Sequence, residues 1–500
     1  MTHQVDTDFL ALPLQAVSDA AIQSGLSLGA SHVDVRIERV RTGVLQMRDT
    51  SPESQTDESV TGVGVRVIVN GAWGFASSPE ISTTKAYELA KVAVAMAITS
   101  GPLSTEKIAL APEPVYASQT WVSEYEIDPF DISGEEKIAR LADLNGRLLK
   151  SSTVTNASAF SMFVKEQKHY ADSYGTSTTQ QRVRMQTAIE AIHVSDKGFE
   201  SMRTLAQPAG FGWEWMGNSV WNWDEEIAEL PTLLAEKVAA PSVEAGRYDL
   251  VIHPSNLWLT IHESIGHATE LDRALGYEAN YAGTSFATVD NLGTLQYGSS
   301  QMNVTGDRLT PHGLSTVGYD DEGVAAQRWD IIKNGLLVGY QLDRRIAARA
   351  GQERSNGCAF ADSPSHVPIQ RMPNVSLQPN PDGPDLDGLI AGVEDGIFIK
   401  GDNSWSIDMQ RYNFQFTGQQ FHRIKNGKLV GQVKDVAYQA TTTDFWRSMK
   451  AVGGPSTYVL GGAFNCGKAQ PGQIAAVSHG CPAAVFDKVN VLNTVAEAGK

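Results

Sequence analysis

Cysteine is scarce in this sequence. Only three of the 500 residues are cysteines, at positions 358, 466 and 481. Three thiols cannot form the disulfide framework that stabilises small secreted proteins. The low number suits a reducing compartment, and it leaves each thiol free for chemistry or for the hydrophobic core.

Positive charge is also in short supply, because 40 lysines and arginines stand against 57 aspartates and glutamates, for a formal net charge of −17. An acidic chain without a long basic run is a poor partner for nucleic acid phosphates or an anionic membrane surface. The sequence has no apolar run of about 18 residues that could span a bilayer. Its first residues show no basic leader followed by an apolar stretch and a cleavage signal. We therefore expect a cytoplasmic protein that binds neither nucleic acid nor membrane.

The composition that remains is globular. Apolar residues make up 42% and charged residues 19%, which is enough apolar material for a sizeable core. The length predicts about three domains. We divide the chain into an N-terminal α/β domain (1–110), a middle α+β region (111–243) and a C-terminal β-rich domain (244–500). The predicted fold class is α+β, with a large antiparallel, barrel-like C-terminal domain.

The first two regions alternate between helical and strand patterns. Helical spacing of apolar residues predicts helices at 9–28, 84–97, 135–149 and 224–239. Alternating apolar residues predict strands at 32–40 and 60–77, with a hairpin turn at Asn70-Gly71, and antiparallel strands within 151–220. Residues 101–132 are rich in proline and acidic groups and are expected to form a linker.

The C-terminal region begins with a predicted strand at 248–254. Ser255 is a candidate N-cap for a helix that continues through 256–271. Residues 284–485 are rich in glycine and in short β-like runs, and Asn334-Gly335 and Asn426-Gly427 are hairpin signals. This texture is typical of a closed or nearly closed antiparallel sheet.

The helix at 256–271 contains the most informative segment, His262-Glu263-Ser264-Ile265-Gly266-His267. It resembles the HExxH motif of zinc peptidases with one residue inserted. Histidines five positions apart lie about 140° apart on an ideal helix and cannot share a metal ion. A π-bulge would bring His267 back over His262, and Gly266 is a residue type that tolerates such a distortion. We therefore predict a widened helix at 262–267.

The chemistry of these residue types gives each a role. Neutral imidazoles of His262 and His267 would bind Zn²⁺, and Glu263 would be the general base of a hydrolase. A catalytic zinc site needs a third protein ligand and an open position for water.

Four residues are candidates for the third ligand. Glu270 and Asp272 follow His267 closely, where carboxylates usually orient an imidazole rather than bind the metal. Cys466 lies in a Gly-flanked segment with Lys468, which would favour the thiolate. Cys481 is the fourth candidate, although it and Cys358 fit a buried apolar role better. His479 could contact a substrate or cap a turn.

Several separate segments resemble the TldD/PmbA family of metallopeptidases, specifically its TldD-type member. HESIGH resembles the family's HEAxGH signature, and HATELD its continuation. Five further blocks resemble family segments in the same order: 29–38, 315–339 with its DDEG, 354–377 with its SNG and RMPN, 394–401, and NCGK at 465–468. The resemblance extends from about residue 28 to about residue 487.

The resemblance implies zinc bound by His262, His267 and Cys466, with Glu263 as the general base. It implies a substrate that is a short or unfolded peptide bound in extended form as an added strand. It also implies a homodimer, or a heterodimer with a PmbA/TldE-type partner that lacks the metal motif. The present chain would then be the active subunit.

Two alternatives stay open on the sequence. One is a metallopeptidase whose third ligand is a carboxylate such as Glu270. The other is a non-catalytic, chaperone-like subunit that binds peptides and whose metal site is structural or vacant. An intact Glu263 argues against the second, since a purely structural site needs no base.

Overall fold

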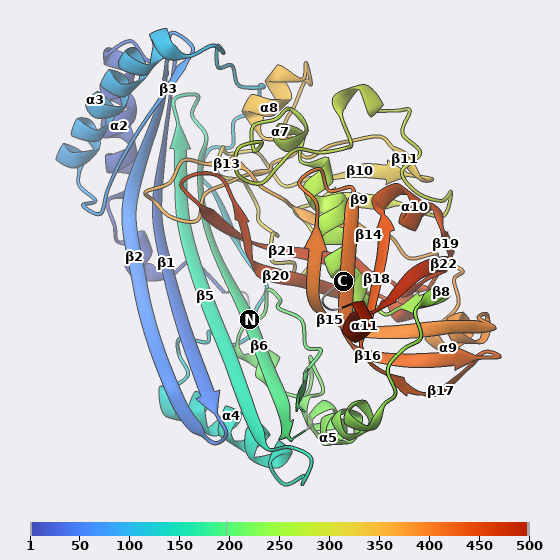
Figure 1. Ribbon diagram of the computed structural model, residues 1–500. Helices are drawn as coiled ribbons and strands as arrows, with labels where there is room; N and C mark the ends of the chain where they lie inside the picture. The colour runs from blue at the N-terminus through green and yellow to red at the C-terminus, as the bar shows by residue number, and fades with distance from the viewer. Residues whose placement is uncertain (1–2, 197, 498–500) are drawn as a thin grey trace.

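The computed structural model describes residues 3–196 and 198–497 and shows a long curved sheet beside a more compact C-terminal part (Figure 1). The long sheet has the strand order β3-β2-β1-β5-β6-β4, with β7 paired to β6. All neighbours in it are antiparallel except β4 and β6. Its strands are β1 (His32–Arg48), β2 (Ser51–Val69), β3 (Ala72–Ser78), β4 (Gln119–Val122), β5 (Asn156–Asp172), β6 (Ser177–Ser195) and β7 (Gly198–Arg203).

Two pairs of helices lie near opposite ends of this sheet (Figure 1). At one end, α2 (Leu14–Ser27) and α3 (Thr83–Ser100) pack on the sheet around a core that includes Val35 and Val65. At the other end, α4 (Gly134–Leu148) and α5 (Trp223–Ala239) pack around a second core that includes Leu45 and Ile189. Strands of 17 to 19 residues are roughly 60 Å long, which leaves room for both cores along one strand. The short helices nearby are α1 (Thr7–Leu10), η1 (Gly101–Leu103) and η2 (Trp213–Met216).

Strands from both of the first two predicted regions build this sheet. β1 pairs with β5 along its length, from Asp34 opposite Asp172 to Arg48 opposite Ser158. The division near residue 110 stays a prediction. The expectation of a linker throughout 101–132 was wrong at Gln119–Val122, which pairs with β6 because its extended backbone completes the sheet edge.

The C-terminal part contains a closed five-stranded barrel. Its strands follow the order β15-β8-β22-β18-β16, and β16 pairs back to β15. The pairing is antiparallel except between β8 and β15. The predicted α+β class with a barrel-like C-terminal domain is therefore confirmed, with one parallel pair. The barrel strands and their two neighbours are β8 (Gly246–Ile252), β15 (Asp395–Ile407), β16 (Asn413–Lys425), β17 (Lys428–Val433), β18 (Val436–Thr441), β19 (Met449–Val452) and β22 (Ala484–Asn493).

Smaller elements surround the barrel. Asn334-Gly335 and Asn426-Gly427 form the predicted hairpin turns, and both pairs have the positive φ angles that such turns require. None of the described helices is long and apolar enough to cross a membrane. The remaining strands are β9 (Val304–Asp307), β10 (Arg328–Lys333), β11 (Leu336–Leu337), β12 (Ala359–Phe360), β13 (Ile369–Gln370), β14 (Asn374–Leu377), β20 (Val459–Lys468) and β21 (Gln473–Cys481). The remaining helices outside the site are α8 (Arg344–Arg349), η5 (Val289–Asn291), α9 (Leu386–Ala391), α10 (Thr442–Arg447), η6 (Pro455–Thr457) and α11 (Thr494–Glu497).

Helix α6 (Pro254–Ile261) is buried along its whole length and fixes the position of the segment that follows. Asn256 donates hydrogen bonds of 2.9 Å to the carbonyls of Gly401 and Thr417 in two barrel strands. The predicted N-cap at Ser255 was wrong. His253 is the N-cap, because Pro254 starts the helix with its fixed φ and the His253 ring accepts from the Ser255 N–H.

Candidate metal centre

The chain widens into a π-helical turn, η3 (His262–Gly266), directly after α6. The N–H of His267 bonds to the carbonyl of His262, five residues back. This bond brings the two histidines together, with ring centroids 4.6 Å apart and the rings edge to face. The predicted widening is confirmed, and the helix continues as η4 (His267–Thr269) and α7 (Leu271–Ala274).

Gly266 is needed here for space rather than for backbone freedom. Its φ of −52° is ordinary for a helix. A Cβ at this position would lie 2.5 Å from Sδ of Met372. The close approach of Met372 therefore explains the glycine, and the expected conformational reason was wrong.

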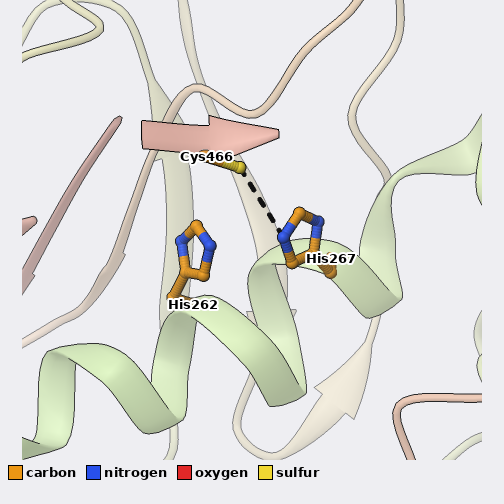
Figure 2. Close-up of side chains that lie close together, drawn as sticks. All are labelled: His262, His267 and Cys466. Carbon is orange, nitrogen blue, oxygen red and sulfur yellow. Dashed lines mark hydrogen bonds between the residues drawn. The ribbon is translucent and has the colours of Figure 1, made fainter. Parts of the chain in front are cut away.

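Cys466 reaches the histidines from β20. The pairing of β20 with β21 shifts register between Ala463 and Cys466, which marks a bulge. Sγ of Cys466 lies 3.6 Å from Nε2 of His267, and one donor atom from each of His262, His267 and Cys466 lies within 4.8 Å of the others (Figure 2). All three side chains are buried. The structure thus brings together the three ligands that the resemblance implied.

A chain of hydrogen bonds fixes the orientation of His262. Nδ1 of His479 lies 2.9 Å from the carbonyl of Val375, so this nitrogen carries the proton and donates. Nε2 of His479 is then an acceptor and takes a 2.7 Å bond from Nδ1 of His262. The lone pair of His262 is left on Nε2, as metal binding requires. Burial lowers the pKa of His479 well below its usual value, which keeps it neutral.

Glu270 holds His267 in the same way. Its Oε2 accepts a 2.8 Å bond from Nδ1 of His267, which leaves Nε2 directed at Cys466. Lys468, fully buried, contacts Oε1 of Glu270 at 3.0 Å and Asp272 at 2.8 Å. Glu270 and Asp272 therefore pair with Lys468, and Glu270 orients an imidazole instead of facing the other donors.

The pKa of the Cys466 thiol lies below its usual value. Burial raises the pKa of this thiol, but the electrostatic influence of His267 and Arg371 outweighs burial. Lys468 was expected to favour the thiolate and instead pairs with Glu270 and Asp272. Cys481 lies apart, 3.8 Å from the carbonyl of Pro254, and burial raises its pKa.

Glu263 is paired with Arg411, a residue that the sequence did not point to. Their carboxylate and guanidinium are 2.7 Å apart. Burial raises the pKa of Glu263, but His262, His267 and Arg411 outweigh it, so the carboxyl stays ionised. Arg411 has a φ of 63°, an unusual conformation for a residue with a side chain. It lies in the turn between β15 and β16. The sequence of this turn has no glycine that would indicate such a backbone conformation.

These residues open into one cleft of about 420 Å³. Its floor holds His262, Glu263, His267 and Cys466, and its walls come from distant parts of the chain. Residues 186–188 of β6 line the cleft together with 203, 204 and 206–208, and residues 462–467 of β20 line it as well. The long N-terminal sheet and the barrel region therefore both shape the cleft.

Three models of one protein family match successive parts of this chain. The model of the PmbA/TldA metallopeptidase C-terminal domain matches residues 245–493, that of domain 1 matches 33–97, and that of the central domain matches 127–241. This chain belongs to the PmbA/TldD family of metallopeptidases. It is thus an enzyme of the peptidase class, and its metal-motif helix lies in the family's C-terminal domain.

Individual relatives cover almost the whole PmbA/TldD chain. A metalloprotease of Methanothermobacter thermautotrophicus is 26% identical over 96% of this chain and 97% of its own length. A zinc metalloprotease TldD homolog of Saccharolobus solfataricus is 22% identical over 94% and 98%. The solved TldE of Thermococcus kodakarensis matches with a TM-score of 0.71 at 15% identity, over 95% of this chain and 99% of that one, and shares its fold.

Proposed function

We propose that this PmbA/TldD chain is a zinc-dependent peptidase whose ligands are Nε2 of His262, Nε2 of His267 and Sγ of Cys466. The single observation that carries this proposal is the oriented donor set, in which both imidazoles are held by their Nδ1 atoms and leave Nε2 free beside the sulfur of Cys466. Two nitrogens and one sulfur suit Zn²⁺, and three protein ligands are typical of catalytic rather than structural zinc. The zinc metalloprotease named among the relatives supports the same metal.

Zn²⁺ bound there would supply Lewis acidity that polarises a peptide carbonyl and favours deprotonation of a water molecule. Glu263 is the proposed general base. It follows His262 in the same widened turn, lies in the cleft, and is ionised. Its carboxylate would take the proton of the attacking water and deliver it to the leaving amine. Arg411 would hold the carboxylate in place between turnovers.

Short or unfolded peptides are the proposed substrates, bound in extended form along β20. Among the described residues β20 pairs with β21 alone, so no strand occupies its other edge, where a peptide could add as a strand. Residues 462–467 of this strand line the cleft beside Cys466. A peptide on this edge would pass the proposed metal ligands with its backbone, while β6 limits the space for its side chains.

A cleavage assay tests the function. An unstructured peptide of about ten residues is incubated with wild-type protein and with Glu263→Gln, and products are followed by mass spectrometry. We expect wild-type cleavage, loss of at least about a hundredfold in Glu263→Gln, and equal zinc content in both. Equal zinc without cleavage by either chain would favour the peptide-binding subunit instead.

We further propose that the chain acts as a dimer, with a second copy or with a PmbA/TldE-type chain. The shared fold of the solved TldE supports the second pairing. Light scattering on the purified chain, alone and with such a partner, tests it. A monomer that cleaves peptides without a partner would contradict it.

A further inference from the structure

A second and larger cavity is lined by residues that directly follow Lys468, whereas residues that directly precede Lys468 line the catalytic cleft. It encloses about 590 Å³, compared with about 420 Å³ for the catalytic cleft. Cys466 and Gly467 line the cleft, whereas Ala469 and Gln470 line this cavity. Its size suits a small-molecule ligand, and the proposed peptidase chemistry does not use it.

The cavity contains two buried carboxyl groups that form no ion pair among the described residues, and the guanidinium of Arg345 also lines it. Glu278 and Asp343 are 7% and 6% exposed, and neither has a lysine, arginine or histidine within ion-pair distance among the described residues. Each accepts one backbone hydrogen bond, from Ala469 and Ile346 respectively. Burial, and then neighbouring Glu322, raise the pKa of Asp343 to about 8. A carboxyl with this pKa is largely protonated at neutral pH, and a cationic ligand would favour its ionised form.

The same cavity has hydrogen-bond donors without partners. Gln370 and Arg66 line it and are only 1% and 4% exposed. Nε2 of Gln370 and Nη2 of Arg66 have no acceptor among the described residues. The other atoms of both groups are fixed, since Oε1 of Gln370 accepts from Lys468 and Nε and Nη1 of Arg66 bind carboxylates. A buried donor without a partner is costly, and an acceptor oxygen beside it would relieve that cost.

Aromatic side chains complete the wall. Trp73, Tyr277 and Tyr281 line the cavity, and Tyr281 is 54% exposed at its rim. Together the wall offers anionic groups, donors and an aromatic surface. A molecule that answers all three carries an ammonium group, a carboxylate and an apolar side chain.

We propose that this cavity binds a free amino acid or a dipeptide. The ammonium group of the ligand lies against Glu278 and Asp343. Its carboxylate accepts hydrogen bonds from Gln370 and Arg66, and its side chain packs on Trp73. The chemistry of the wall alone carries this inference, so it stands apart from the proposed cleavage of peptides.

Calorimetric titration of the intact wild-type protein with L-phenylalanine tests the proposal, because this probe has no peptide bond to cleave. Two analogues each lack one charge: phenethylamine has no carboxylate, and 3-phenylpropionate has no ammonium. We expect L-phenylalanine to bind, and each analogue to bind at least about tenfold more weakly.

Two variants assign the ends of the ligand. Glu278→Gln should weaken the binding of L-phenylalanine at least about tenfold and leave the binding of 3-phenylpropionate unchanged. Gln370→Leu should weaken the binding of L-phenylalanine and leave the binding of phenethylamine unchanged. Asp402→Asn, a substitution in the catalytic cleft, is the matched control and should leave the binding of L-phenylalanine unchanged.

Tyr281→Ala removes an exposed ring at the rim and should also weaken the binding of L-phenylalanine. Because this ring is exposed, the variant provides a test even if a buried variant fails to fold. Three results would overturn the proposal. One is no binding of L-phenylalanine up to about 10 mM. Another is binding that neither Tyr281→Ala nor the folded buried variants reduce. The third is binding that Asp402→Asn abolishes, which would place the ligand in the cleft.

Discussion

His479 accepts a 2.7 Å hydrogen bond from His262 and thereby decides which nitrogen of His262 faces the cleft. The bond depends on the Val375 carbonyl behind it, which holds the proton of His479 on Nδ1. His479 therefore sets the tautomer of His262. Its ring also stacks on Trp258, with centroids 6.3 Å apart, so its orientation is fixed by packing as well.

Replacing His479 should weaken zinc binding without removing a ligand. His479→Phe keeps a ring beside Trp258 but offers no acceptor to His262. We expect zinc affinity, measured by competition with a coloured chelator, to fall about 10- to 100-fold. His479→Gln can still present an acceptor oxygen and should retain more of the affinity. Equal affinity in both variants would mean that His479 only fills space.

Cys466→Ala should abolish stoichiometric zinc. The wild-type protein is expected to carry about one zinc per chain, measured by mass spectrometry of the metal. Cys481→Ala is the matched control, since that thiol is buried and lies away from the two histidines. Full zinc retention in Cys466→Ala would restore Glu270 as a candidate ligand.

Gly266→Ala should destabilise the metal-site helix. The new methyl group would lie 2.5 Å from Sδ of Met372, and overpacking of this kind costs about 1–3 kcal/mol. The double variant Gly266→Ala, Met372→Ala should recover part of that loss, because the smaller side chain leaves space. Urea unfolding of the three chains measures it, and no recovery would show that the backbone itself requires glycine.

Lys468→Met should destabilise the protein strongly. It leaves Glu270 and Asp272 buried without their shared cation, and breaking a buried pair from one side costs about 3–5 kcal/mol. Adding Asp272→Asn removes one of the stranded charges and should restore part of the stability. Thermal unfolding compares the variants, and a Lys468→Met chain as stable as wild type would contradict the role of this network.

His169 should make the N-terminal sheet sensitive to acid. Burial lowers its pKa to about 4 in the folded chain, from 6.5. Between these values the unfolded chain binds a proton that the folded chain does not, so stability is lost as pH falls from 6.5 towards 4. The loss from pH 7.5 to 5 is about 2 kcal/mol.

His169→Gln should remove this part of the pH dependence. Urea unfolding at pH 7.5 and pH 5 measures the difference for each chain. Between pH 7.5 and 9 the stability gap between the two chains should stay constant. A variant with the full acid sensitivity of wild type would assign the effect to other groups.

Local patterns predicted the local parts of the site. A five-residue histidine spacing has one helical solution, so the π turn could be inferred before any coordinates. The third ligand could not be inferred from residue chemistry alone, because the register of β20 and its bulge decide which side chain reaches the histidines. Only the resemblance selected Cys466. The pairing of β1 with β5 was likewise hidden, since alternation predicts strands but not their partners.

Arg411 was missed for a physical reason. It depends on a left-handed backbone in a turn without glycine and on a partner 148 residues away. Arg371 belongs to a segment that carried the resemblance, but nothing in the sequence linked it to Cys466, whose carbonyl it binds. Contacts between segments so far apart in the sequence follow from the tertiary fold, and a single sequence does not encode them locally.

Cys466 and His267 are 199 positions apart in the sequence. During synthesis the ribosome therefore releases the two histidines and the proposed general base long before the cysteine that would complete the site. A nascent chain lacks one of the three proposed ligands until β20 has emerged. If the proposed site is the catalytic one, fragments truncated before β20 are expected to have no zinc-dependent peptidase activity.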